Sequence, residues 1–357
     1  MNINVKTLQR AENILRKQKG VYSATMRVES GDGSFVWTTG TPNFSFNQPF
    51  FIASVTKLYI TSLIFLLQQE GKLKLSDSIH LYIPEEMMNQ LHVYKGKDYS
   101  RDITIKHLIS NTSGLPDYFF HKLPDNSTFA SNILRNKDVA FTLEETIMYV
   151  KKLQPKFSPR EKRKAAYSDT NYQLLGKIVE TVTQSSLHDV FKQKIFDPLN
   201  LKHTYTYNDA TDKTPISFYY HDKELWVPNY MTTITAEGGI VSTAEEVMIY
   251  LKSFFQGQFL SQKEIESLKD WRLIFPPPSL FYFGIGLEKL FIPRFVSPVN
   301  PITEILGFWG QTGSFAWYNP QTDLYFTGTT NQIDGKGHAA AMKAILAIIK
   351  AALKVVK

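Results

Sequence analysis

The sequence contains no cysteine among its 357 residues, and this absence excludes several kinds of site. Without thiols the chain can form no disulfide, no thiolate nucleophile and no thiolate-ligated metal centre. Its eight histidines are scattered, and neither a His-Glu-x-x-His motif nor a close cluster of histidines with carboxylates occurs. We therefore expect neither a metal ion nor a cofactor.

Long apolar runs are absent as well. The longest strongly apolar run, LYITSLIFLL (58–67), is about half of the ~20 residues that a membrane-spanning helix needs. The first twenty residues, MNINVKTLQRAENILRKQKG, are charged and lack the apolar centre and cleavage site of a signal peptide. We therefore expect no membrane partner and a cytoplasmic location, or a periplasmic or secreted one if an export signal has been removed.

The formal net charge of +7 raises the question of a nucleic-acid partner. Acidic and basic residues are interspersed, except in short clusters such as PREKRKAA (159–166), and no recognition motif accompanies these clusters. A solvated surface explains such a cluster more simply. We expect no nucleic-acid partner, and the oligomeric state stays open.

A content of 43% hydrophobic and 13% aromatic residues is enough for a large core. Alternating and helical patterns mark the two ends of the chain, and helical segments broken by polar loops fill 74–270. The terminal patterns predict a helix at 5–18, strands at 21–30 and 34–40, strands at 314–320 and 323–330, and a helix at 339–356.

Strands at both ends with helices between them predict an α+β fold. We expect one antiparallel sheet, flanked by the N- and C-terminal helices, in a domain made of residues 1–75 and 280–357. Residues 76–279 would form an inserted, mostly helical domain.

One pair of polar residues stands out in the apolar segment FFIASVTKLYITSLIFLLQQEGKL (50–73). Ser54 and Lys57 are three residues apart, so on a helix their side chains are neighbours. Burial and the positive end of the helix dipole both oppose a cation in the first turn, so we expect a lowered pKa for Lys57. Such an amine can take the proton of Ser54 and make it a nucleophile.

The pair by itself leaves a second interpretation open. Ser54 could simply cap the helix while Lys57 extends to solvent. A Ser-x-x-Lys pair arises by chance about once in a chain of this length. Only the surrounding sequence can favour one interpretation over the other.

The surrounding sequence resembles the penicillin-recognising serine hydrolases, in the branch of class C β-lactamases, family VIII carboxylesterases and D-aminopeptidases. The resemblance extends over most of the chain and rests on several segments in the family's order. They are FFIASVTK, EGKLKLSDSIHLYIPE, ITIKHLISNTSGLPDY, YSDTNYQLLGKIVETVTQSSL, IFDPLNLKHT, AEGGIVSTAEEV and WGQTGSFAWYNP. It implies a β-lactamase/transpeptidase-like fold with the active site between a sheet domain and a helical domain.

The resemblance also implies roles for particular residues. Ser54 matches the nucleophile and Lys57 the lysine of the motif. Tyr167, in YSD, matches the tyrosine that acts with that lysine as general base and acid. For that role cations should lower the pKa of Tyr167 from ~10, with Lys57 close to it.

The family's third motif, usually Lys-Thr-Gly or His-Thr-Gly, falls on Gln311, Thr312 and Gly313. The resemblance then implies an oxyanion hole formed by the backbone N–H groups of Ser54 and Ser314. Two further Thr-Gly pairs occur at 39–40 and 327–328, so the assignment depends on the strand pattern that follows.

Two residues depart from the family's commonest pattern. Asp169 stands where an asparagine is usual, and Gln311 stands where a cation or histidine is usual. Both changes make the site less cationic, so binding of a substrate carboxylate should be weaker. Aromatic clusters at 117–120, 218–226 and 275–284 are candidates for the wall of a substrate pocket, although core packing is the commoner fate of such residues.

These observations predict a serine hydrolase that forms an acyl-enzyme on Ser54. Its substrate would be a small-molecule ester, amide or β-lactam. We favour a carboxylesterase-like activity with weak β-lactam hydrolysis. A β-lactamase or a D-amino-acid peptidase or carboxypeptidase is the alternative within the family. A binding or sensory protein that keeps the fold without turnover is the alternative outside enzymes.

Overall fold

A computed structural model describes residues 3–122, 126–275 and 281–355. Its α-helices are α1 (Val5–Lys17), α2 (Thr56–Gln69), α3 (Glu85–Met88), α4 (Ile105–Ile109), α5 (Phe129–Leu134), α6 (Leu143–Val150), α7 (Asp169–Thr183), α8 (Leu187–Phe191), α9 (Pro228–Thr233), α10 (Ala244–Phe255), α11 (Gln262–Ser267) and α12 (Lys336–Val355). Short 3-10 turns are η1 (Ala53–Val55), η2 (Ile79–Leu81), η3 (Ser100–Asp102) and η5 (Arg294–Val296), and η4 (Lys192–Phe196) is a π-helical turn.

The strands are β1 (Thr25–Ser30), β2 (Val36–Gly40), β3 (Phe50–Phe51), β4 (Val93–Tyr94), β5 (Lys97–Asp98), β6 (Tyr205–Thr206), β7 (Phe218–Tyr220), β8 (Lys223–Leu225), β9 (Ile240–Ser242), β10 (Arg272–Phe275), β11 (Phe281–Phe283), β12 (Glu288–Leu290), β13 (Ile305–Trp309), β14 (Ser314–Asn319) and β15 (Leu324–Thr329). The terminal helices and strands predicted from the sequence are therefore present, within a few residues at each end.

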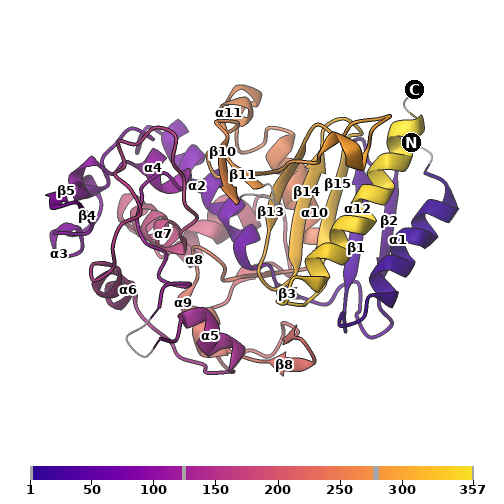
Figure 1. The fold of residues 1–357 in the computed structure, drawn as a ribbon, viewed down its shortest axis with the longest axis horizontal. Coiled ribbons are helices and arrows are strands. Elements are labelled where there is room, and N and C mark those ends of the chain that lie inside the picture. The colour runs from indigo at the N-terminus through magenta and orange to yellow at the C-terminus, as the bar shows by residue number, and fades with distance from the viewer. Residues whose placement is uncertain (1–2, 123–125, 276–280, 356–357) are drawn as a thin grey trace.

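The largest sheet has eight strands in the order β10-β11-β12-β13-β14-β15-β1-β2 (Figure 1). Every neighbouring pair in it is antiparallel. The two ends of the chain meet where β1 pairs with β15, with Thr25 opposite Thr329. This confirms the predicted α+β fold with one antiparallel sheet built from both termini.

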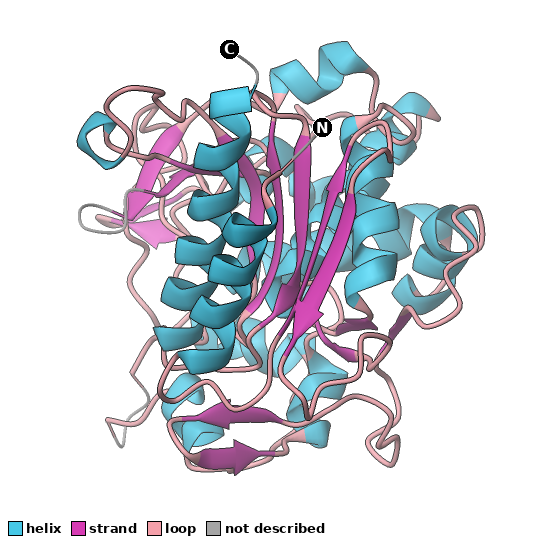
Figure 2. Cartoon of the chain, turned by 90° about the vertical axis from the view of Figure 1, so that its right-hand side faces the viewer, coloured by secondary structure: helices cyan, strands magenta, loops and turns pink. Residues whose placement is uncertain are grey.

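Helices cover both faces of this sheet. Figure 2 shows α1 and α12 side by side in front of the strands, and α10 packs on the other face against β1, β14 and β15. The alternation of β15 explains the two layers, because successive side chains of a strand point to opposite faces. Leu324 and Phe326 lie in the core under α12, whereas Tyr325 lies in the larger core on the other side.

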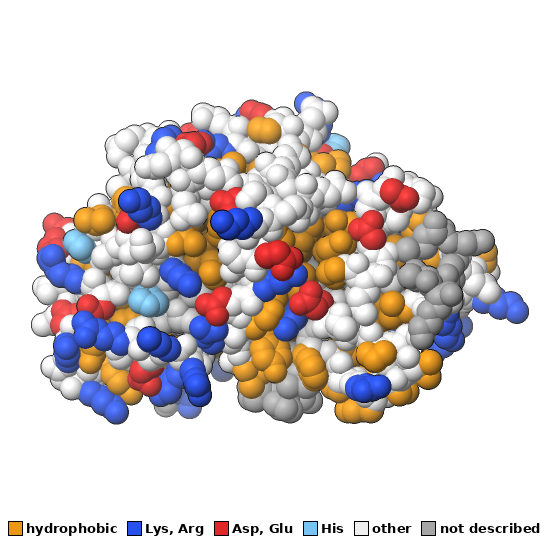
Figure 3. Space-filling model, turned by 90° about the horizontal axis from the view of Figure 1, so that it is seen from above, with side chains coloured by type: hydrophobic (Ala, Val, Ile, Leu, Met, Phe, Trp, Pro, Cys, Tyr) orange, Lys and Arg blue, Asp and Glu red, His pale blue; other side chains and the backbone are white. Residues whose placement is uncertain are grey.

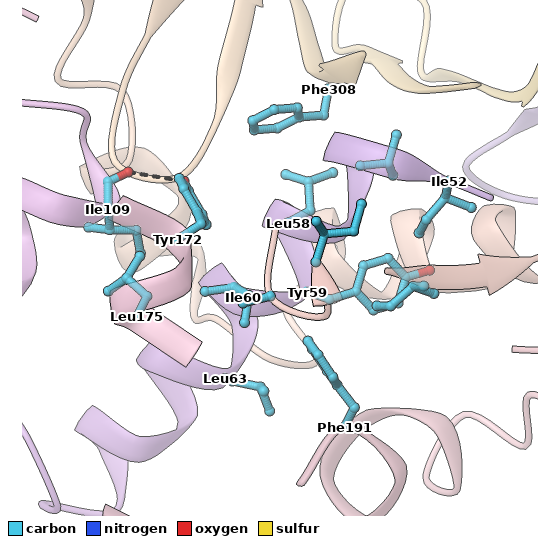
Figure 4. Packing of buried hydrophobic residues seen from close by; sticks show 14 of the residues in the cluster. Ile52, Leu58, Tyr59, Ile60, Leu63, Ile109, Tyr172, Leu175, Phe191 and Phe308 are labelled. Atoms are coloured by element: carbon cyan, nitrogen blue, oxygen red, sulfur yellow. Dashed lines mark hydrogen bonds between the residues drawn. The ribbon is translucent and has the colours of Figure 1, made fainter. Parts of the chain in front are cut away.

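Helix α2 runs through the larger core and is buried on nearly all sides. Leu58, Ile60 and Leu63 pack among side chains of other elements, including Phe191 and Phe308 (Figure 4). A helix that is apolar all round belongs in the interior, between the sheet and the helical part of the chain. Its first turn is consequently held in one place.

Acidic and basic side chains are mixed over much of the face seen in Figure 3. In the described part of the chain, no helix combines the length and the apolar composition needed to cross a membrane. The division into a domain of residues 1–75 and 280–357 and a domain of residues 76–279 stays a prediction. After the helical part of the chain, the next strand of the large sheet is β10, which begins at Arg272.

Candidate active site

Ser54 lies in the turn η1, between β3 and the start of α2. The preceding residue, Ala53, has a φ of +46°, a left-handed conformation that is unfavourable for a residue other than glycine. The helix itself begins at Thr56, so Lys57 is its second residue. The sharp turn therefore places Ser54 just before the first turn of a rigid, buried helix.

Lys57 has no exposed surface, and its Nζ contacts three oxygen atoms. It donates to the backbone carbonyl of Glu237 at 2.7 Å and to Ser54 Oγ at 3.0 Å, and it lies 2.8 Å from Asp169 Oδ1. Two of these oxygen atoms accept hydrogen bonds from the ammonium group, and the third, Asp169 Oδ1, forms an ion pair with it. The buried lysine thus has the partners that burial of a cation requires, rather than extending to solvent.

Tyr167 contacts the same serine through its hydroxyl group. Its hydroxyl donates to Ser54 Oγ at 3.0 Å, and its ring centroid lies 5.3 Å from Lys57 Nζ. Asn111 fixes the tyrosine segment, because its carbonyl accepts from Ala166 N at 2.9 Å and its side chain accepts from Ser168 N at 3.2 Å. The structure thus brings together the three residues that the resemblance singled out.

The electrostatic environment of Tyr167 differs from the expectation. Burial raises the pKa of its hydroxyl well above 10, and the nearby carboxyl groups of Asp169 and Glu288 act in the same direction. The prediction that cations lower this pKa is therefore wrong. Desolvation and negative charge disfavour the phenolate more than the hydrogen bond to Ser54 favours it. A neutral phenol is a proton donor, not a base.

The segment from Gln311 to Ser314 is tied to the serine turn by two hydroxyl groups. Thr312 Oγ1 donates to the carbonyl of Phe51 at 2.8 Å, and Ser314 Oγ donates to the carbonyl of Ile52 at 2.6 Å. These bonds hold β14 beside η1, so the assignment of the third motif to 311–313 agrees with the geometry. Asp169, the first residue of α7, reaches the site through its contact with Lys57.

Glycine is required at two positions, one just before this segment and one within it. A Cβ atom on Gly310 would lie 2.0 Å from Ser314 Oγ and 2.4 Å from the carbonyl of Ile52. Gly313 has a φ of +85°, which favours glycine, and a Cβ there would lie 2.5 Å from Thr330 Oγ1. Side chains at either position would push the segment away from the serine turn.

Three further carboxyl groups surround the cluster, and the sequence analysis assigned no role to them. Burial raises the pKa of Glu237 and of Glu288 to about 8 each. Burial also raises the pKa of Asp117 to about 7, with a contribution from the charge of Asp169. One buried cation cannot balance four carboxylates, so near neutral pH these groups tend to keep their protons while Asp169 pairs with Lys57.

The signal for these acids in the sequence is weak. Glu237 belongs to AEGG and Asp117 to GLPDY, two segments that carry the family resemblance. Only the fold shows that both are buried, with 3% and 5% of their surface exposed. Tyr118 Oη and Gln173 Nε2 donate to Glu237 Oε1 at 2.7 and 2.8 Å, so the carboxyl group is fixed in the interior.

Two cavities adjoin the cluster. A small one of about 30 Å³ is lined by Ala53, Gln311, Thr312 and apolar side chains that include Phe119 and Phe218. A larger one of about 360 Å³ is lined by Asp117, Phe120, Tyr167, Phe275 and others. The aromatic clusters at 117–120 and 218–226 therefore contribute to the walls. Of the cluster at 275–284, residues 276–280 lie outside the described residues.

Among the described residues, no group of three or more His, Asp or Glu side chains is arranged to hold a metal ion.

Comparison with known proteins agrees with this geometry. The model of the Beta-lactamase family matches residues 17–349. A putative D-alanyl-D-alanine carboxypeptidase of Salmonella gallinarum is 32% identical over 161 residues, which are 44% of this chain and 34% of that protein. Penicillin-binding protein 4* of Bacillus subtilis is 27% identical over 240 residues, 62% of this chain and 48% of that protein. The matches thus span about a third to a half of the length of these relatives.

Among solved structures, the D-amino acid amidase from Ochrobactrum anthropi, complexed with L-phenylalanine amide, superposes with a TM-score of 0.79. The superposition covers 99% of this chain and 100% of the amidase, at 21% sequence identity. At this identity the likeness shows the fold alone. Together with the family match, which extends over most of the chain, it confirms the resemblance to the penicillin-recognising serine hydrolases: the chain belongs to the Beta-lactamase family.

Proposed function

We propose that this protein is a serine hydrolase that forms an acyl-enzyme on Ser54 and prefers neutral esters. The observation that carries the proposal is the position of Ser54 Oγ, 3.0 Å from both Lys57 Nζ and Tyr167 Oη. A nucleophile with a base and a proton donor at hydrogen-bonding distance is the minimum for acyl transfer.

The raised pKa of Tyr167 supports a division of labour between its hydroxyl and the lysine. In the amine form, Lys57 takes the proton of Ser54 as its Oγ attacks the carbonyl carbon. Tyr167, as a neutral phenol, gives its proton to the leaving alkoxide. The backbone N–H groups of Ser54 and Ser314 stabilise the oxyanion. Water then attacks the acyl-enzyme and gives a proton to the Tyr167 phenolate, and Lys57 returns its extra proton to Ser54 Oγ as the acid leaves.

Two features support an uncharged substrate. Gln311 lines the small cavity beside the serine turn and offers an amide where relatives of this kind usually have a cation. Lys57 is already paired with Asp169, so the site offers no unpaired lysine to a substrate carboxylate. The other walls of the small cavity are largely apolar, so it suits a short hydrocarbon group.

A D-amino-acid amide is the second candidate substrate. The fold matches that of the D-amino acid amidase over the whole of both chains, and the larger cavity contains an acid, Asp117, that could face a substrate ammonium group. Because an amide has a poorer leaving group, this activity would depend more strongly on the proton from Tyr167.

The test is intact-mass spectrometry combined with product assays. The protein is incubated separately with a fluorophosphonate, a p-nitrophenyl ester, a penicillin, and the two enantiomers of phenylalanine amide. We expect a fluorophosphonate adduct on the peptide that contains Ser54, and turnover that is fastest for the ester. Ser54→Ala should remove both, whereas Ser267→Ala on the exposed helix α11 should change neither.

An adduct on another residue, or full turnover by Ser54→Ala, would contradict the proposal. Turnover confined to D-phenylalanine amide would support the second candidate instead. A stable acyl adduct without product release would identify a binding or sensory protein.

A further inference from the structure

The terminal helices form a groove on the face of the molecule that Figure 2 turns toward the viewer. Its volume is about 1020 Å³, and the two helices that line it lie on the side of the sheet away from α2 (Figure 1). One stripe of α1 (Thr7, Arg10, Ile14), one stripe of α12 from Lys343 to Lys354, and the segment 296–300 line it. Nothing in the proposed reaction uses this groove.

The charges in the groove have one sign. Arg10, Lys343, Lys350 and Lys354 line it, and no acidic residue does. Helix α12 contains no Asp or Glu along its whole length. Within the described residues, none of these four cations forms an ion pair. The face seen in Figure 3 mixes both signs, whereas an unbalanced basic groove suits an anionic occupant.

Large apolar side chains lie in the segment 296–300 that lines the groove and directly before it. Val299 lines the groove with 80% of its surface exposed, and Phe295, in the turn η5, is 82% exposed. Arg294, in the same turn, is also exposed. Fully exposed aromatic and aliphatic side chains next to lysines are typical of surfaces that enter the headgroup region of a bilayer.

We propose that this face, formed by α1, α12 and the segment 294–300, docks on the surface of a membrane that contains anionic phospholipids. The cations contact lipid phosphates, and Phe295 and Val299 enter the boundary between headgroups and acyl chains. A polyanion such as a nucleic acid would use the cations but has no acyl region for the two apolar side chains. The lipid surface accounts for both features.

This partner differs from the expectation from the sequence, which excluded a membrane. That expectation concerned a spanning segment, whereas the proposed surface is assembled from three separate segments. Its cations come from both ends of the chain, and its apolar residues come from the connection between β12 and β13.

The test is co-sedimentation of the full chain with large unilamellar vesicles of phosphatidylcholine, with or without phosphatidylglycerol. We expect binding only to the anionic vesicles, and its loss in high salt. Lys343→Glu with Lys350→Glu should weaken binding at least about 25-fold, since each lysine near such a surface contributes about fivefold. Phe295→Ser with Val299→Ser should weaken it about tenfold.

Lys137→Glu with Lys152→Glu is the matched control, because it changes the charge equally at exposed positions near α5 and α6. This variant should bind the vesicles nearly as well as the wild-type protein. Circular dichroism and ester hydrolysis should be unchanged in all three variants, which separates docking from folding and from the proposed reaction.

Equal binding to both kinds of vesicle, or binding to neither, would overturn the proposal. A control variant that binds the anionic vesicles as weakly as the Lys343→Glu, Lys350→Glu variant would also overturn it. Full binding by Phe295→Ser with Val299→Ser would show a general anion surface, and a dimer that the groove variants dissociate without lipid would show that a second copy occupies the face. Either result would also overturn the proposal.

Discussion

Lys57 Nζ lies 2.8 Å from Asp169 Oδ1, so the buried lysine of the Ser-x-x-Lys pair forms an ion pair with the residue that departs from the family's usual asparagine. The same Nζ donates to the serine hydroxyl. The carboxylate and the serine hydroxyl therefore share one buried lysine as their partner.

Asp169→Asn should shift the rise of kcat/KM for ester hydrolysis to lower pH. The reason is that the variant removes the carboxylate that lies in direct contact with the proposed base. The measurement is a pH–rate profile between pH 5 and 10. Asp222→Asn, at an exposed position, is the control. A profile that does not move would show that the ion pair has no part in activating Ser54.

Tyr167→Phe should lower kcat/KM by about 10² to 10⁴-fold, because it removes the proton donor for the leaving group. Tyr172→Phe is a matched control. The Tyr172 ring centroid also lies 5.3 Å from Lys57 Nζ, but its hydroxyl donates to the carbonyl of Ile109 at 3.2 Å (Figure 4). If both variants lose activity equally, the tyrosine acts through packing against the lysine and not through its proton.

Gln311→Lys should change the selectivity between substrates. A hydrogen bond to a charged donor is stronger than one to a neutral donor by about 1 kcal/mol, or roughly fivefold in binding. We expect the ratio of kcat/KM for a carboxylate-bearing ester to that for a neutral ester to rise about fivefold. Gln258→Lys, at an exposed position, controls for the added charge. An unchanged ratio would place the substrate away from Gln311.

Glu237→Gln should flatten the dependence of stability on pH. The pKa of Glu237 is about 8 in the folded protein and ~4.3 in the unfolded chain, so between these values the folded state binds a proton that the unfolded state has released. The free energy of unfolding then falls as pH rises from about 4.5 to about 8. Removing the group should remove its share of this fall, while Glu288, with its own pKa of about 8, still contributes.

Urea denaturation between pH 5 and 9 measures this effect. Glu144→Gln, on the exposed side of α6, should leave the slope unchanged. The same slope in Glu237→Gln and in the wild-type protein would show that the Glu237 carboxyl group is ionised in the folded protein across this range.

The sequence by itself determined the elements at both ends of the chain, the buried character of α2 and the pairing of Ser54 with Lys57. All of these depend on local periodicity, which is complete within a few helical turns or a single strand. The family resemblance then identified Tyr167, which is 113 residues from Ser54 and shares no local pattern with it.

Only the tertiary structure decided the electrostatics of the site and the basic groove. The pKa of a buried group depends on which charges and how little water surround it, and these neighbours come from distant segments. For this reason the expected lowering of the Tyr167 pKa was wrong, and Glu237, Glu288 and Asp117 went unnoticed. The groove likewise exists only where α1 and α12, from opposite ends of the chain, lie side by side on the sheet (Figure 2).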